Sequence, residues 1–152
     1  MLRSLTAVGE ELALGRDVTF SVIVEGAARK LGPPIVDEAY CIGREALLNA
    51  FHHAEASSIE LLIVHGDEGL RLLVRDNGCG IDPSILAKGS RAGHWGLEGM
   101  RERAQEIGSD LEIRSRPGAG TEVELKIPLR ASDRKRVFGS RWWPFHRQAG
   151  ES

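Results

Sequence analysis

The hydrophobic residues of the first third of the chain follow a helical period twice. Residues 2–12 carry leucine and valine at helical spacing and are followed by Gly15, which predicts a short amphipathic helix. Such a short helix is marginal alone in water, so it should pack on another element or be the cut end of a longer helix. Gly32-Pro33-Pro34 then precedes a longer helix over about residues 35–55, because proline suits a helix's first turn and is barred from its interior.

Alternating patterns predict strands in the rest of the chain. Residues 18–24 are rich in β-branched side chains and predict the first strand. Residues 57–78 predict two strands joined by a turn around residues 66–69, and residues 110–116 and 121–129 alternate on either side of a second turn. A glycine-rich loop is expected up to about residue 94, and a third helix from Gly96 to Gly108.

This order of elements predicts the fold class. The order suggests an α+β fold, because it runs helix, strand, helix, two strands, loop, helix and two strands. We expect a two-layer sandwich in which a mixed, mostly antiparallel sheet carries helices on one face.

The polar face of the second helix carries an unusual set of side chains. At about 100° per residue, four polar residues fall within roughly a quarter turn of each other, and these are Glu45, Asn49, His52 and His53. A solvated face is the simplest explanation, yet such faces are usually built from Lys, Glu, Gln and Arg. A carboxylate and an amide oxygen one turn apart can hold or orient hydrated Mg²⁺. The helix therefore makes a phosphate-bearing ligand worth testing.

Three glycine-rich segments follow this helix. Asp76 leaves a predicted strand into Gly78-Cys79-Gly80, so its carboxylate can bond the amine edge of a base while the glycines let a flat ligand approach. The segment GHWGLEGM, residues 93–100, opens the third helix, and the free N–H groups of a helix start favour an anion. The segment PGAGT, residues 117–121, joins the last two strands. Each segment alone is also explained as a turn, whereas their order and spacing together are specific.

Composition narrows the classes of partner. The 152 residues hold 20 basic and 22 acidic side chains, so no general nucleic-acid-binding field is expected. The distribution is uneven, because residues 130–152 hold 6 basic and 2 acidic side chains. Two cysteines without CxxC spacing argue against a disulfide framework and a zinc site and favour a reducing compartment. The longest apolar runs are far shorter than the ~20 residues that cross a bilayer.

Taken in order, four motifs resemble the nucleotide-binding boxes of the superfamily that joins DNA gyrase, Hsp90, histidine kinases and MutL. REALLNAFHHA (44–54) resembles the N box, RDNGCGI (75–81) the first glycine box, GHWGLEGM (93–100) the second and PGAGT (117–121) the third. The resemblance covers about residues 17–129 and is strongest to the ATP-binding catalytic domain of two-component sensor histidine kinases with a short ATP lid. It implies the Bergerat-type ATP-binding fold.

The resemblance also implies a role for each motif residue. Asn49 would coordinate Mg²⁺, Glu45 would hold the metal shell or a water, and His53 would lie near the phosphates. Asp76 would bind the adenine amino group, and Thr121 would support adenine through a water. The remaining nucleotide-binding residues would form the base pocket, the base of the lid and the phosphate-facing helix start: Gly78, Gly80, Ile81, Gly93, Gly96, Leu97, Gly99 and Met100.

Two departures from the family pattern affect these expectations. Many relatives have Lys or Arg at the position of His52, so phosphate contact there would be weaker and pH-dependent. The phosphoacceptor histidine of such kinases lies on a separate dimerisation helix pair, and no His precedes Asp17. Residues 1–16 are therefore expected to end a preceding dimerisation helix or linker, residues 17–129 to form the ATP-binding catalytic domain, and residues 130–152 to be a basic C-terminal tail.

The expected function is that of a histidine kinase catalytic domain. It would present Mg-ATP for phosphorylation of a histidine on a dimerisation domain absent from this chain, with a response regulator as the next partner. An anti-sigma-factor-type serine kinase and a non-catalytic nucleotide-binding module are the alternatives. The expected location is the cytoplasm, or the cytoplasmic part of a membrane-bound sensor. The tail cluster Trp142-Trp143-Pro144-Phe145 is explained as an end segment, as packing on its own domain, or as docking on a partner or membrane surface.

Overall fold

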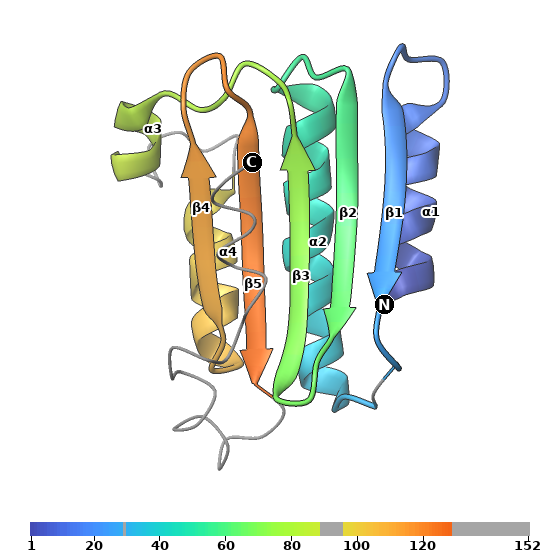
Figure 1. The fold of residues 1–152 in the computed structure, drawn as a ribbon. Helices are drawn as coiled ribbons and strands as arrows, with labels where there is room; N and C mark the ends of the chain where they lie inside the picture. The colour runs from blue at the N-terminus through green and yellow to red at the C-terminus, as the bar shows by residue number, and fades with distance from the viewer. Residues whose placement is uncertain (29, 89–95, 129–152) are drawn as a thin grey trace.

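The computed structural model of the chain describes residues 1–28, 30–88 and 96–128. Its helices are α1 (Leu2–Ala13), α2 (Pro33–His52), α3 (Pro83–Lys88) and α4 (Leu97–Glu106). Its strands are β1 (Thr19–Glu25), β2 (Ser58–His65), β3 (Gly69–Asp76), β4 (Asp110–Ser115) and β5 (Thr121–Pro128). They form one sheet in the order β1-β2-β3-β5-β4, in which β1 and β2 are parallel and the other pairs antiparallel (Figure 1). The α+β fold with a mixed, mostly antiparallel sheet is confirmed.

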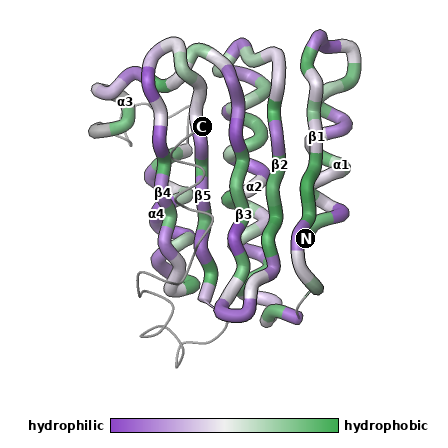
Figure 2. The backbone as a smooth tube through the Cα atoms, viewed as in Figure 1, coloured by the Kyte–Doolittle hydropathy of each residue, from purple (hydrophilic) through white to green (hydrophobic). Residues whose placement is uncertain are grey.

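The helices α1, α2 and α4 lie on one face of the sheet, behind the strands in Figure 1. Side chains alternate between the two faces of a strand, and residues paired in register share a face. The buried Leu72 of β3 pairs with the buried Leu125 of β5, and both belong to the core beneath the helices. Figure 2 shows hydrophobic backbone positions along much of β1 and β2 as well. The core therefore lies between the sheet and this helical layer.

Helix α1 contacts both α2 and β1. Leu5 is 0% exposed. A Cβ built on Gly9 would stand 2.1 Å from the ring of Phe20, so the glycine lets helix and strand approach closely. On α2, a Cβ at Gly43 would stand 2.8 Å from Leu5. The predicted short helix is confirmed and packs on the sheet's own core, while the domain boundary after residue 16 stays a proposal.

Helix α2 has other bounds than the sequence predicts, and helix α3 was not predicted. Helix α2 begins at Pro33, because the two prolines occupy its first turn, and it ends at His52 before Glu55 takes a left-handed φ of 54°. The expected glycine-rich loop contains α3. An Asp82-Pro83 start explains this helix, since the Asp82 carboxylate accepts the Ser84 N–H at 2.8 Å and proline suits the next position.

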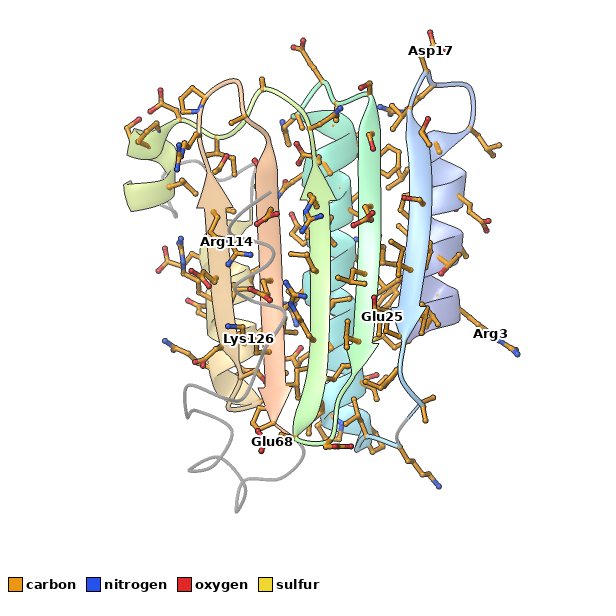
Figure 3. All side chains as sticks on the ribbon, in the orientation of Figure 1. Arg3, Asp17, Glu25, Glu68, Arg114 and Lys126 are labelled. Carbon is orange, nitrogen blue, oxygen red and sulfur yellow. The ribbon has the colours of Figure 1, made fainter. Side chains whose placement is uncertain are left out.

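The sheet face opposite the helices carries charged side chains, of which Figure 3 labels Arg114 and Lys126. The Arg71 guanidinium bonds the Glu124 carboxylate across β3 and β5, and these side chains are 2% and 0% exposed. Burial, the largest single cause, would raise the pKa of Glu124, but the charge and hydrogen bond of Arg71 together with the charges of Lys126 and Arg114 outweigh it, and the pKa is lowered. The face is therefore held by ion pairs between neighbouring strands. None of the described helices is long and apolar enough to span a membrane.

Candidate functional site

A small cavity between α2 and the sheet brings residues of all four motifs together. It has a volume of about 10 Å³, close to what one water needs. The predicted site residues that line it are Asn49, Asp76, Gly80, Ile81, Leu97 and Thr121. These residues are up to 72 positions apart in the sequence, so the fold itself assembles them.

Asp76 is the acidic group of this cavity. It is the last residue of β3 and is 7% exposed. Burial raises the pKa of its carboxyl group, and hydrogen bonds from the backbone N–H groups of Gly78 (at 2.8 Å) and Thr121 partly oppose the rise. A fixed acceptor at the wall of a mostly apolar cavity favours a ligand edge that donates hydrogen bonds.

Close main-chain approaches hold the first and third glycine boxes in place. A Cβ on Gly78 would stand 2.1 Å from the carbonyl oxygen of Ala54. A Cβ on Gly120 would stand 2.1 Å from the carbonyl oxygen of Asp76, and Gly120 also has a φ of 84°. Only glycine fits these positions without moving backbone. Gly78 packs against Ala54 and does not line the first cavity, and its predicted part in shaping a base pocket stays a prediction.

Hydrogen bonds tie the same segments together. The Cys79 N–H donates to the Ala54 carbonyl at 2.6 Å, and the Cys79 carbonyl accepts from the Gly118 N–H at 2.6 Å. The side-chain oxygen of Asn77 accepts the Ser58 N–H at 2.9 Å. The end of the N box, the first glycine box and the third glycine box thus form one bonded unit around Asp76.

Ser115, the last residue of β4, adds a side-chain link to this unit. Its Oγ accepts the Ile81 N–H at 2.7 Å and donates to the Gly120 carbonyl at 3.0 Å. It also lies 2.8 Å from Oγ1 of Thr121. One hydroxyl therefore contacts both glycine boxes and a residue that lines the cavity.

A second cavity, of about 270 Å³, lies between α2 and α4 and takes in the other predicted residues of these helices. It is lined by Glu45, Gly96, Gly99 and Met100, together with Cys41, Arg44 and Arg103. Glu45 lies against Gly96, which precedes the first residue of α4 and has a φ of 63°. The start of a helix favours negative charge, and Arg44 and Arg103 add positive charge. Two negative groups offset this charge in part, since Glu45 lines the same cavity and the Arg103 guanidinium bonds the Glu38 carboxylate at 2.6 Å.

The remaining predicted residues lie elsewhere. His53 follows the end of α2, is half-buried, and lines neither of these two cavities within the described residues. His52 is exposed on the last turn of α2. Gly93 lies outside the described residues.

Sequence reasoning missed the small apolar residues that shape the first cavity. They are Ala46, Ala50, Ala54, Val74 and Val123. A signal for them exists. Val74 stands two positions before Asp76 and Val123 two positions after Thr121, so each valine shares a strand face with its polar neighbour. Ala46 and Ala50 lie on the turns of α2 around Asn49, and Ala54 follows the end of that helix. Small side chains there leave room that larger ones would fill.

The chain matches the family described as "Histidine kinase-, DNA gyrase B-, and HSP90-like ATPase" over residues 37–131. That match covers more than half of the chain, so the chain belongs to this family.

Curated relatives of the chain are sensor proteins. It is 40% identical over 82 residues to the nitrate/nitrite sensor protein NarX of Escherichia coli K12, covering 54% of this chain and 13% of the relative. It is 33% identical over 120 residues to the sensor protein VraS of Staphylococcus aureus, covering 79% and 33%. It is 38% identical over 95 residues to the sensor histidine kinase LiaS of Bacillus subtilis, covering 62% of this chain and 25% of the relative. The chain thus spans a third or less of these relatives' length.

Solved structures show the same fold. The catalytic domain of histidine kinase ThkA superposes with a TM-score of 0.71 at 16% identity, covering 87% of this chain and 92% of that one. The histidine kinase domain of a blue-light activated kinase from Erythrobacter litoralis superposes with a TM-score of 0.69 at 24% identity, covering 90% of this chain and 66% of that one. With the family match, they confirm the resemblance to the ATP-binding catalytic domain of sensor histidine kinases.

Proposed function

We propose that the chain binds Mg-ATP across the two cavities and presents its γ-phosphoryl group to a histidine on a dimerisation domain outside this chain. A response regulator would then receive the group. The observation that supports this most directly is the meeting of all four motifs at one cavity with the Asp76 carboxylate at its wall. Phosphoryl transfer asks a protein mainly for positioning and charge neutralisation, which a preformed cleft can supply.

In this proposal the base of ATP enters the first cavity. The Asp76 carboxylate accepts a hydrogen bond from the adenine amino group, and Ile81 and Leu97 cover the apolar ring. A purine is larger than the cavity, which is close to the size of one water. Leu97 is the first residue of α4 and follows the left-handed Gly96, so we expect this first turn to move when a base enters and the cavity widens.

The phosphates would then extend toward the second cavity and the start of α4, near Arg44 and Arg103. Among the described residues, no group of three or more His, Cys, Asp or Glu side chains could hold a metal ion. Mg²⁺ takes one or two protein oxygens and completes its shell with phosphates and waters. Asn49 and Glu45 supply such oxygens, and the ion would neutralise phosphate charge. His53 would contact the phosphate region from the end of α2.

The experiment has two readouts on the full chain. Calorimetry with ATP and ADP, with and without Mg²⁺, should show binding that Asp76→Asn abolishes. Transfer of phosphate from labelled ATP to a supplied dimerisation domain of a sensor kinase should depend on the acceptor histidine. Absence of binding at millimolar ATP would overturn the proposal, and binding without transfer to any histidine-bearing domain would favour the non-catalytic alternative.

A further inference from the structure

Strand β3 is buried on both of its faces, although α1, α2 and α4 cover only one face of the sheet. Leu72 belongs to the core beneath these helices. Its neighbours Arg71 and Leu73 lie on the opposite, open face, where they are 2% and 0% exposed. A strand with one face in water alternates between buried and exposed positions, which β3 does not do. Ion pairing alone does not explain this burial, because Arg75 bonds Glu122 on the open face and is still 37% exposed.

The burial is concentrated at one end of the open face. In the β3–β5 register, Arg75 pairs with Glu122 and Leu73 with Glu124. The first pair is 37% and 22% exposed, whereas both residues of the second pair are 0% exposed. Pro128, the last residue of β5, is buried as well. The other end of the face holds a cavity of about 500 Å³ lined in part by Arg75 and Glu122. We call the buried end the covered patch, and it consists of Val64, Arg71, Leu73, Glu124 and Pro128.

The C-terminal segment, residues 129–152, leaves the sheet at the covered patch. It follows Pro128 directly, and its aromatic cluster is Trp142-Trp143-Pro144-Phe145. Residues 129–142 can span up to about 46 Å when extended. Five strands spaced about 4.8 Å apart make a sheet only about 20 Å across. The aromatic cluster can therefore reach any part of the open face.

The composition of the C-terminal segment complements this face. Open-face positions on the five strands carry six acidic and four basic side chains, counted from the strand registers. The segment carries 6 basic and 2 acidic side chains, so the net charges are opposite. Its tryptophans combine a large apolar surface with an N–H donor, which suits a patch in which Leu73 lies beside a buried ion pair.

We propose that the C-terminal segment folds back over the open face and covers the patch with Trp142, Trp143 and Phe145. The covered half of the sheet then has three layers, and the end with the open cavity has two. Because the segment is tethered to Pro128, its effective concentration at the patch is far higher than that of a second copy in solution. This docking surface goes beyond the proposed function and does not depend on nucleotide binding.

The test uses tryptophan fluorescence of the full 152-residue chain. The difference between the wild type and Trp142→Phe/Trp143→Phe isolates the emission of these two tryptophans, since Trp95 is common to both chains. We expect this emission to be shifted to the blue and to be quenched by acrylamide several-fold less efficiently than in urea. The shielding should be independent of protein concentration.

Two leucine variants locate the docking surface. Leu62 is half-buried on the open face and pairs with Leu73, so Leu62→Ser should increase the quenching of the two tryptophans. Leu111→Ser is the matched control, because Leu111 is half-buried on the face that the helices cover. It should leave the quenching unchanged. If Leu62→Ser does not fold, Leu62→Thr, which suits a strand, replaces it with the same expectation.

Four outcomes would overturn the proposal. The first is quenching in the native chain as efficient as in urea. The second is shielding that is lost on dilution, which would mean that a second copy covers the patch. The third is shielding that appears only with vesicles of anionic phospholipid, which would make the segment a membrane contact. The fourth is equal quenching in the Leu62 and Leu111 variants, which would mean that the segment packs elsewhere.

Discussion

The Glu45 carboxylate lies against Gly96, so that a Cβ on residue 96 would stand 2.6 Å from its Oε1. Gly96 also has a φ of 63°. Gly96→Ala should therefore cost about 1 kcal/mol of stability through backbone strain and also displace Glu45 from the start of α4. Gly15→Ala is the control, since Gly15 has a φ of 72° with nothing within 4 Å.

Thermal melts and ADP calorimetry on both variants separate strain from displacement. We expect similar losses of stability but weaker Mg²⁺-dependent binding in Gly96→Ala alone. If both variants bind ADP equally well, the position of Glu45 beside Gly96 does not matter for Mg²⁺-dependent binding.

Nucleotide binding should weaken in mild acid. Burial, the largest cause, raises the pKa of Asp76 above its ordinary value of 3.8, so its carboxylate takes up a proton at a higher pH than in the unfolded chain. As pH falls through this raised pKa, the acceptor for the ligand is lost. The same shift lowers the stability of the folded chain at neutral pH, and this penalty disappears as the group becomes protonated.

The pH effect is measured as ADP affinity from neutral pH downward, with melting curves at each pH. Affinity that stays constant down to the ordinary titration range of aspartate would contradict a role for Asp76 in binding.

Asn49→Ala should remove the Mg²⁺ dependence of binding. Asn49 is 7% exposed on α2 and lines the first cavity. A hydrogen bond to a charged group is worth about 1.5–3 kcal/mol, so the affinity for ADP in Mg²⁺ should fall roughly tenfold to a hundredfold. In chelator, the variant and the wild type should bind alike. A variant that keeps its Mg²⁺ effect would remove Asn49 from the metal site.

Two glycines in helices should respond to alanine with opposite signs. Gly9→Ala in α1 should destabilise by about 1–3 kcal/mol, because its Cβ would stand 2.1 Å from the Phe20 ring and force repacking. Gly99→Ala in α4 meets nothing within 4 Å and should stabilise by up to about 1 kcal/mol through helix propensity. Urea unfolding of both variants measures the difference. A neutral Gly9→Ala would mean that α1 does not pack tightly on β1.

Glu124→Gln should be among the most destabilising polar substitutions in the described part of the chain. It removes the charge that faces the buried Arg71, and breaking a buried pair costs about 3–5 kcal/mol. Glu60→Gln, whose partner Arg75 is 37% exposed, should cost less than about 1 kcal/mol.

The pair of Arg71 and Glu124 also predicts that the folded chain loses stability in acid. Because the net pKa shift of Glu124 is downward from 4.5, its stabilisation is present above that pH and lost as pH falls through the lowered pKa. As the pH is lowered below 4.5 and on through the lowered pKa, the unfolding midpoints of the wild type and Glu124→Gln should converge. Midpoints that stay apart in acid would contradict this.

Much of the fold could be predicted because the signals were local. The turn around residues 66–69 predicted β3, alternation predicted β5, the glycine after the first helix marked its end, and Asp76 was placed at a strand end, all as found. Helix α3 was missed since a six-residue helix is too short to show a period, and its Asp-Pro start was the only cue. Glu45 and Asn49 share a helix side, yet they line different cavities because the packing of α4 divides that side.

Ser115 could not be found from the sequence for a related reason. A serine ending a strand has no pattern of its own, and its partners come from residues 81, 120 and 121. Such a role depends on distances across the sheet that no spacing along the chain encodes.

The main-chain bonds that join Ala54, Cys79 and Gly118 have a consequence for building hybrid proteins. The motifs look separable in the sequence, each a short cassette that could be exchanged between kinases. In the folded chain, however, the carbonyl of one motif is the hydrogen-bond partner of the next. A chimera that takes one motif from another kinase would lose the matching hydrogen-bond partners in the other motifs. Exchanging residues 54–58, 76–81 and 115–121 together would keep these hydrogen bonds.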